Sequence, residues 1–508
     1  MIASQTLTWF ARHELMLAWR DWASMMAGGR TARERVVTLM TLGFVGFLHW
    51  LAYAILNPVL KGGIAVTVPA LVMLTSSLLL TFSMMLSQAI EQVTRSFYAR
   101  ADLDLILSSP APAQHLFAVR IASIAFAGML VTSLLAAPFI NTAAALDGPH
   151  WLSAYAVIAA LSTFSTGLAV MAAVALYRAV GPKRTRLIAQ IVAAIIGAAL
   201  LIGIQAIAVM TYGNLSRFQV LNSDAVLNAA PDVTSLWWIP AMALLGDATA
   251  AIAMITAGAL FLVYVIRTYA PRFAEQAIAT ASVSDEKETN SAAKRAFAPR
   301  TAPQALRAKE WQLLRRDPWL LSQSLMQVLY LIPPALLLLR DMGPNAKVHI
   351  VLAPVLVMAF GQLAGGLAWL AISGEDAHDL VATAPVPERA LVRAKNEAVL
   401  AVIVAGSVPF LFGLAFLSPW AAGATAVGIA VASASAILIQ MWFKVTAQRT
   451  LFRRRQMASK AATFAEAFSS IFWAGATGLA AAQSWFAVLF VIAALATLAL
   501  ARFISPRQ

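Results

Sequence analysis

The chain is dominated by unbroken apolar runs of about 20 residues, the length that an α-helix needs to cross the hydrocarbon core of a bilayer. Only 12% of its 508 residues are charged, whereas soluble proteins average about 25%, so the sequence lacks the surface of a soluble fold. The runs do not alternate polar and apolar residues, as strands of a membrane β-barrel do. The sequence therefore predicts an all-α polytopic membrane protein.

Twelve such runs occur, six before and six after a long polar interval. They cover residues 36–58, 64–88, 116–140, 152–177, 187–212, 248–266, 319–339, 349–372, 398–417, 420–443, 462–481 and 485–503. The runs that meet near Pro419 and near Gln483 are so close that each pair can also be interpreted as one long helix. The distribution of basic residues tests the count.

Lys and Arg residues are concentrated on one side of the predicted membrane. If both termini are cytoplasmic, 33 of the 37 lie on the cytoplasmic side, and only Lys61, Arg217, Arg340 and Lys347 lie outside. Because basic residues are retained in the cytoplasm, a missed or additional span would remove this bias. The pattern predicts twelve spans with both ends inside. It also explains the net charge of +14 without a nucleic-acid partner, since these loops face anionic lipid head groups.

A polar interval divides the chain into two halves. Residues 273–303 include SVSDEKETNSAAKR, which is typical of a flexible cytoplasmic linker. We therefore expect a first six-helix half at 1–270, a linker at 271–303 and a second six-helix half at 304–508. Each half is expected to begin with an interfacial helix.

Two kinds of segment occur once in each half. DLILSSPAPAQHLFAVR at 104–120 aligns with DLVATAPVPERALVRAK at 379–395, and HELMLAWRD at 13–21 aligns with KEWQLLRRD at 309–317. Both kinds lie on the cytoplasmic side, at the same place relative to the runs of their half. This arrangement indicates two parallel repeats, because an inverted repeat would place the second copy on the opposite side.

The upstream segment is amphipathic in its second copy. Leu306, Leu313 and Leu314 fall on one face and Trp311 flanks them, a pattern that predicts a helix lying in the head-group layer. The first copy is less cleanly segregated. The matched polar residues of the two interfacial helices are Glu14, Arg20, Asp21, Glu310, Arg316 and Asp317.

The downstream segment contains a P-x-P pair, which cannot continue a helix and forces an extended turn. Acidic residues precede the pair and basic residues follow it. Such a turn can dock a cytoplasmic partner; the alternative is an ordinary capped loop whose basic residues only set the topology. The residues of the two candidate docking loops are Asp102, Asp104, Ser108, Pro110, Pro112, Glu375, Asp376, Asp379, Pro385 and Pro387.

LILSSPAP at 105–112 and, more loosely, LVATAPVP at 380–387 resemble the loop by which permease subunits of type-2 ABC exporters contact their ATPase. The resemblance implies an exporter of the inner (plasma) membrane, with two six-helix halves fused in one chain and a separate ABC ATPase subunit, in two copies, as partner. ATP and Mg²⁺ would bind that partner, since this chain has no phosphate-loop sequence and is expected to bind no cofactor. Spans with few charges suggest an apolar or amphipathic substrate.

Few residues within the runs are candidates for chemistry. His49 is a weak candidate for a substrate contact, and a neutral His bonded to a neighbouring helix is the alternative. Glu466 lies about one helical turn inside the start of its run. There it either serves a function or reaches the cytoplasmic surface. The chain has no Cys, and its six His residues lack metal-ligand spacing, so neither a metal site nor catalysis is expected. Gly361 and Gly365 predict close helix packing.

Two other functions remain open. A twelve-helix secondary carrier driven by an ion gradient would need carboxylates near the middle of the membrane, and a membrane enzyme or scaffold would need a polar cluster. The exterior segment 213–247 contains SLWWIP, whose Trp237 and Trp238 suit a membrane interface. This segment is expected either to return partly into the lipid or to form an interfacial loop.

Overall fold

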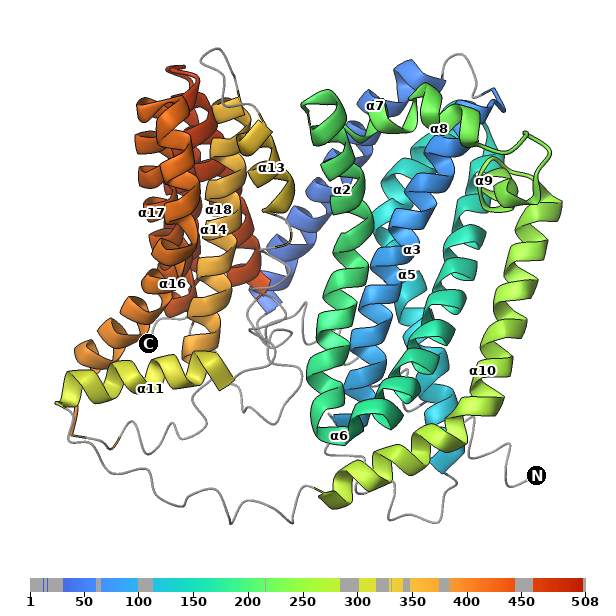
Figure 1. Cartoon of the computed structure of the whole chain (residues 1–508), viewed down its shortest axis with the longest axis horizontal. Helices are drawn as coiled ribbons and strands as arrows, with labels where there is room; N and C mark the ends of the chain where they lie inside the picture. Colours follow the sequence, from blue (N-terminus) through green and yellow to red (C-terminus); the bar gives the residue numbers. More distant parts are fainter. Residues whose placement is uncertain are drawn as a thin grey trace. The chain divides into compact units, whose positions relative to one another are not determined.

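The computed structural model describes residues 12, 16, 31–60, 65–98, 113–214, 216–283, 301–316, 329, 331–340, 348–373, 383, 385–443 and 460–505. Of this described part 91% is helical and none is strand, in agreement with the apolar runs. In chain order (Figure 1) the elements are α2 (Thr31–Leu60), α3 (Val68–Tyr98), α5 (Ala113–Asp147), η1 (Pro149–Leu152), α6 (Ser153–Tyr212), α7 (Arg217–Leu221), α8 (Asp224–Ala229), η2 (Leu236–Trp238), α9 (Ile239–Leu244), α10 (Ala248–Val283), α11 (Ala302–Arg316), α13 (Ile332–Arg340), α14 (Val348–Ser373), α16 (Glu388–Leu417), α17 (Pro419–Trp442), α18 (Lys460–Ala481) and α19 (Ala487–Ile504).

Nine helical segments of the described ranges are long and apolar enough to cross a membrane. They are Val68–Arg95, Gln114–Asp147, Pro149–Gly181, Leu187–Tyr212, Ala248–Pro271, His349–Ile372, Glu388–Leu417, Pro419–Trp442 and Ala487–Ile504. A shorter apolar segment, Val45–Leu60, lies in α2, and α18 occupies the predicted place but is more polar than the nine. The chain is an all-α polytopic membrane protein. The count of twelve stays a prediction, because most of the predicted span 319–339 lies outside the described residues.

The two closely spaced pairs of runs form separate helices. Ser418 between α16 and α17 is extended (φ −157°, ψ 105°), and its hydroxyl accepts a hydrogen bond from the N–H of Ala421 at 3.2 Å. This side-chain cap starts a new helix where the previous one ends. Between α18 and α19 the chain turns at Gln483, whose φ is 56°. The interpretation of either pair as one long helix is therefore wrong.

The predicted runs 152–177 and 187–212 both lie within the single element α6. Its helical geometry is interrupted at Gly181 (φ 73°, ψ 170°), a backbone conformation open to Gly and rarely adopted by other residues. The first apolar segment ends at Gly181, and the second begins at Leu187. The two predicted runs, 152–177 and 187–212, are thus joined by a kink at Gly181 within one helical element.

The described chain forms two compact units by its internal contacts. The first comprises Met1–Leu201 and Arg217–Lys287, and the second comprises Ile202–Ser216 and Glu288–Gln508. In the first unit, α3, α5, α6 and α10 pack around buried apolar side chains that include Ile90, Phe117, Val170 and Val265. The last turns of α6 therefore belong to the second unit.

The segment between α6 and α10, which is predicted to lie outside the membrane, folds into the short helices α7, α8, η2 and α9. Leu221 and Trp238 from this segment pack against Leu71 of α3, and the indole N–H of Trp238 donates to the carbonyl of Asp232 at 3.0 Å. Trp237 is 79% exposed. Of the two Trp residues expected at a membrane interface, only Trp237 is available for it, because Trp238 is buried beneath the segment.

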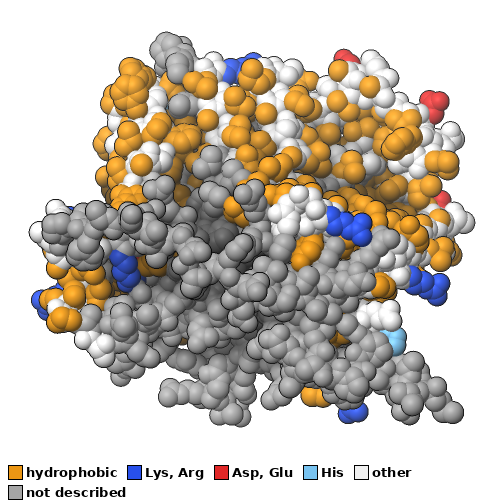
Figure 2. Space-filling view, turned by 60° about the horizontal axis from the view of Figure 1, so that its bottom comes forward, with side chains coloured by type: hydrophobic (Ala, Val, Ile, Leu, Met, Phe, Trp, Pro, Cys, Tyr) orange, Lys and Arg blue, Asp and Glu red, His pale blue; other side chains and the backbone are white. Residues whose placement is uncertain are grey.

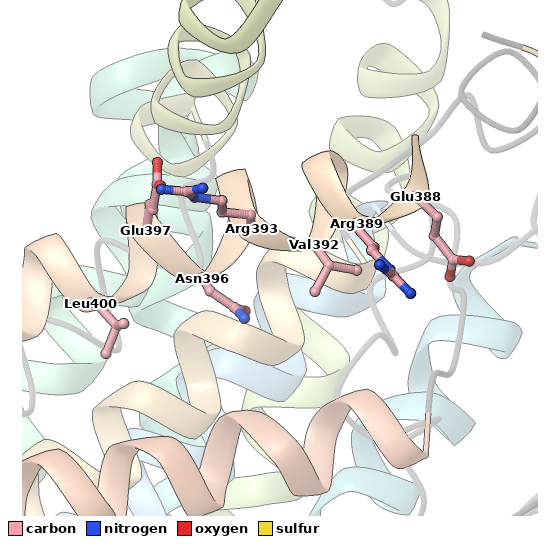
Figure 3. A pocket seen from close by; sticks show the side chains of 7 residues that line it. All are labelled: Glu388, Arg389, Val392, Arg393, Asn396, Glu397 and Leu400. Atoms are coloured by element: carbon pink, nitrogen blue, oxygen red, sulfur yellow. The ribbon is translucent and has the colours of Figure 1, made fainter. Parts of the chain in front are cut away.

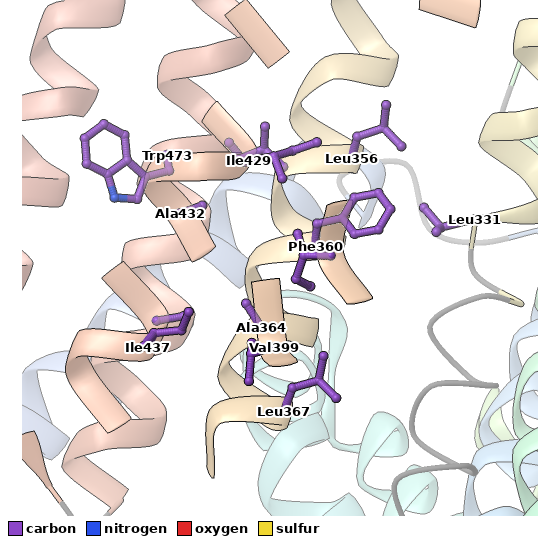
Figure 4. Packing of buried hydrophobic residues seen from close by; sticks show 14 of the residues in the cluster. Leu331, Leu356, Phe360, Ala364, Leu367, Val399, Ile429, Ala432, Ile437 and Trp473 are labelled. Carbon is purple, nitrogen blue, oxygen red and sulfur yellow. The ribbon is translucent and has the colours of Figure 1, made fainter. Parts of the chain in front are cut away.

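Helices α14, α17 and α18 form the centre of the second unit. One face of α14 meets α17 and α18 (Figure 4). The side chains in this core include Leu356, Phe360, Ala364, Leu367, Ile429, Ala432, Ile437 and Trp473. Gly residues let the backbones approach, since a Cβ on Gly361 would lie 3.2 Å from the Cβ of Ala432, and one on Gly428 would lie 2.8 Å from Cγ2 of Val357. Small residues at contacts are typical of helix packing in lipid.

Large apolar side chains also point outward. Leu134, Leu135, Phe412, Phe416 and Phe503 are 64%, 73%, 65%, 72% and 82% exposed. Figure 2 shows hydrophobic side chains over much of the described surface in that view. Soluble monomers rarely expose large contiguous apolar patches, whereas acyl chains cover them at no cost. The outward faces therefore agree with a membrane environment.

Replacement of Gly365 by Ala should destabilise the second unit, because the added Cβ would lie 2.7 Å from Oε2 of Glu466 and closer still to Oε1. Overpacking of this kind costs about 1–3 kcal/mol. The neighbouring Gly366 has no atom within 4 Å of such a Cβ, so Gly366→Ala is the matched control. Thermal unfolding in detergent should show a lower midpoint for Gly365→Ala alone; equal midpoints for both variants would contradict the close packing.

Candidate site for coupling to a cytoplasmic partner

Helix α11 is the second predicted interfacial helix. It begins after Thr301, whose N–H donates to the side chain of Gln304 at 3.2 Å. Leu314 is buried in the core of the second unit, whereas Trp311 is 42% exposed. Within this unit α11 runs across the direction of α14 and α16 (Figure 1). The amphipathic pattern therefore places one face of α11 on the bundle.

Helix α16 begins where the second P-x-P pair ends. Pro387 has φ −60° and ψ 133°, an extended conformation that precedes the first helical residue, Glu388. The carbonyl of Pro387 accepts the first bond of the new helix, from the N–H of Ala390 at 2.9 Å. The P-x-P pair thus ends in a helix start, as its geometry requires. The helix begins ten residues before the predicted span 398–417, so its first turns are polar.

A buried ion pair joins these two helices. Glu310 of α11 is 1% exposed, and its Oε1 lies 3.3 Å from Nζ of Lys395 in α16 and 3.5 Å from Nζ of Lys309. Lys395 also donates to the carbonyl of Ala371, in the last turn of α14. A cation there satisfies a carbonyl that has no partner within the helix and complements the helix dipole. One ammonium group therefore ties together α11, α14 and α16.

A second, exposed pair lies one helical turn away. The carboxylate of Glu397 accepts from Nε of Arg307 in α11 at 2.6 Å and from Nε of Arg393 at 2.8 Å. The hydrogen bond to Glu397 raises the pKa of Arg307 above its ordinary value. Beside this pair an open groove of about 560 Å³ runs along α16 (Figure 3). The groove is lined by Glu388, Arg389, Val392, Arg393, Asn396, Glu397 and Leu400.

The structure describes part of the predicted site. Pro385, Pro387, Glu310 and Arg316 lie within the described residues, and Arg316 is the last residue of α11. The structure brings the helix that follows Pro387 into contact with Glu310 through Lys395. The predicted residues that lie outside the described part are Glu14, Arg20, Asp21, Asp102, Asp104, Ser108, Pro110, Pro112, Asp317, Glu375, Asp376 and Asp379.

The partners of Glu310 and Glu397 were not predicted from sequence. Lys395 aligns with Arg120, and the basic residues after each P-x-P pair are interpreted from the sequence either as part of a docking turn or as residues that set the topology. In the first unit Arg120 is 4% exposed, with Cζ 5.9 Å from the ring centroid of Phe117. A basic residue that serves only to set topology is normally left in water. The basic residue shared by the two repeats was the signal present in the sequence, and the structure shows that both side chains are largely buried.

His49 and Glu466, the two candidate functional residues within the predicted spans, have different surroundings. Nδ1 of His49 lies 2.8 Å from the carbonyl of Val45, one turn earlier in the same helix. Glu466 is 8% exposed and accepts a hydrogen bond at 2.6 Å from Nε2 of Gln440. It does not reach the surface as the snorkelling alternative would require. No group of three or more His, Cys, Asp or Glu in the described residues could hold a metal ion.

Lys395→Met should destabilise the protein by about 3 kcal/mol, because it leaves a buried carboxylate short of its cation. This value is at the low end for a broken buried pair, since Lys309 remains 3.5 Å from Glu310. The control is Arg393→Met on the same helix, which should cost less than about 1 kcal/mol because that side chain is 77% exposed. Denaturant unfolding in mixed micelles measures both.

The double variant Glu310→Gln with Lys395→Met should be more stable than Lys395→Met alone, since no charge is then left buried. If the double variant is destabilised relative to wild type by the sum of the two single effects, the two residues do not act as a pair.

Comparison with known proteins identifies no relative of this chain. The sequence matches no protein-family model, no curated protein and no solved structure. The function proposed below is therefore argued from the motifs of the two repeated segments and from the contacts among α11, α14 and α16.

Proposed function

We propose that the chain is the transmembrane permease subunit of an ATP-driven exporter of the type-2 ABC kind, energised by a separate ATPase subunit in the inner (plasma) membrane. The observation that carries the proposal is the junction at Lys395, which links α16, α14 and α11 immediately after the second P-x-P segment. The LSSPAP-like motifs supply the resemblance. Outward apolar faces and scarce charge within the spans favour an apolar or amphipathic substrate.

The junction offers a route for mechanical coupling. An ATPase docked on the Pro385–Pro387 turn would act directly on the first turn of α16, a helix of 30 residues with Pro409 in its interior. At 1.5 Å per residue this helix is about 45 Å long, enough to cross the bilayer. Movement of its cytoplasmic end would also displace α11 and the end of α14, through Glu310 and the Ala371 carbonyl. ATP binding could then shift a two-state equilibrium by favouring one arrangement.

A tagged full chain purified from its native membrane in mild detergent should retain an ATPase that has a phosphate loop. Asp379→Ala should lower the amount of bound ATPase by about tenfold, equivalent to about 1.4 kcal/mol. Asp104→Ala should do the same if the first loop is also used. Asp224→Ala in α8, on the predicted exterior, is the matched control. Equal ATPase recovery from all three variants would contradict docking at these loops.

A second candidate, the secondary carrier with twelve helices, is favoured by one observation. Glu466 is a buried carboxylate inside the second unit, and such residues mark coupling sites in gradient-driven carriers. Full transport by the purified chain in ATP-free vesicles, driven by an ion gradient, would support the carrier and exclude the permease.

The proposed topology can be mapped with single cysteines, because the chain has none of its own. A membrane-impermeant maleimide should label Asn228→Cys in α8 and Ala482→Cys in the turn after α18 in intact cells. Thr301→Cys, before α11, should react only after permeabilisation. Labelling of Thr301→Cys in intact cells would overturn the proposal of twelve spans with both ends inside.

A further inference from the structure

The open groove along α16 has no part in the proposed coupling. It follows the helix from Glu388 to Leu400 (Figure 3), a little over three turns. Charged side chains and the amide of Asn396 line its first part, with Val392 among them, and Leu400 closes the other end. The groove therefore has a polar end and an apolar end along the helix axis.

The length of α16 places the polar end of the groove in the head-group layer. A helix of 30 residues is about 45 Å long, whereas the hydrocarbon core is about 30 Å thick. If the predicted span 398–417 fills the core, residues 388–397 extend beyond it by about 15 Å. The amphipathic helix α11 contacts this same part of α16 through Arg307 and Glu397, as expected of a helix that lies in the head-group layer. Leu400, by contrast, lies within the first turn of the predicted span.

An apolar ridge continues from the groove into the predicted span. Leu400, Val404, Val408 and Phe412 are 40%, 57%, 52% and 65% exposed. Residues at intervals of four form one continuous ridge along a helix surface. A molecule seated at the polar end could therefore extend an acyl chain along this ridge and remain inside the hydrocarbon.

Positive charge prevails at the polar end of the groove. The carboxylate of Glu397 accepts hydrogen bonds from two guanidinium groups, those of Arg307 and Arg393. Glu388 and Arg389 carry the other two charges of the lining. Among the described residues that line the groove or bond to Glu397, three are thus Arg and two are Glu. An anion at this depth would meet an excess of one positive charge.

We propose that the groove binds an anionic phospholipid of the cytoplasmic leaflet. The phosphate lies at the polar end, with Arg389 and Arg393 as its cations and the NH₂ of Asn396 as a further donor. Guanidinium groups suit this role, because their planar donors bind phosphate oxygens in pairs. One acyl chain follows the ridge from Leu400 to Phe412. The site rests on the predicted cytoplasmic position of this end of α16 and is independent of how the protein is energised.

Native mass spectrometry of the full chain, purified in detergent and titrated with lipid, counts the bound molecules. The first dioleoyl phosphatidylglycerol should bind about tenfold more tightly than dioleoyl phosphatidylcholine, which has the same chains and phosphate but no net charge. Arg389→Gln should lower the affinity for phosphatidylglycerol about tenfold, because a charge-assisted hydrogen bond is lost. Arg267→Gln is the matched control, since Arg267 is exposed near the predicted cytoplasmic end of α10. Equal affinity of the wild type for the two lipids, or an unchanged affinity of Arg389→Gln for phosphatidylglycerol, would overturn the proposal.

Inorganic phosphate distinguishes a lipid site from a site for free phosphate. An excess of it should leave the bound phosphatidylglycerol in place, because phosphate lacks the acyl chain that the ridge would hold; displacement of the lipid would overturn the proposal. Arg393→Gln, one turn further along the groove, keeps the test decisive if Arg389→Gln fails to fold, and it should weaken binding in the same way. Lipid binding is measured without an ATPase, so its failure is separate from a failure of the co-purification experiment.

Discussion

The hydrocarbon core of a bilayer neither hydrates charge nor supplies hydrogen bonds, and the rest of this structure follows from that constraint. Backbone groups must be bonded within each segment, so the spans are helices. Large apolar side chains can face outward, as Phe416 and Phe503 do, because lipid covers them. The interior then has no hydrophobic driving force of its own. The helices of the second unit instead approach through Gly361, Gly365 and Gly428, where close contact adds dispersion attraction.

The same constraint decides what charged side chains do. In the second unit Lys395 and Arg340 both satisfy carbonyls at helix ends. Lys395 donates to Ala371 in the last turn of α14, and Arg340 donates to Val209 and, at 3.4 Å, to Thr211 near the end of α6. Glu466 has an amide as its described hydrogen-bond partner. These two cations are therefore bonded to helix ends, and Lys395 also to a carboxylate.

Comparison of the two repeated segments shows how position constrains chemistry. Lys395 and Arg120 occupy matching places in the sequence, and both side chains are largely buried in their own units. A basic residue retained only for topology could remain in water, so burial in both indicates a structural part in each. Glu310, which pairs with Lys395 in the second unit, has a counterpart at Glu14 in the sequence. That the same pair forms in the first half stays a prediction.

The sequence by itself determined the class of fold and the approximate position of most helices. Run length, hydropathy and Pro positions are local properties, so α14 and α17 lie close to their predicted bounds, and α16 ends at its predicted residue but begins ten residues earlier. Only the tertiary structure decided which polar groups meet. The bond between Glu466 and Gln440 joins residues 26 positions apart, and that between Lys395 and Glu310 joins residues 85 apart. Periodicity fixes the face on which a side chain lies but not the neighbour that the face will contact. For the same reason Trp238, which the sequence suggests for a membrane interface, is instead buried in a hydrophobic core.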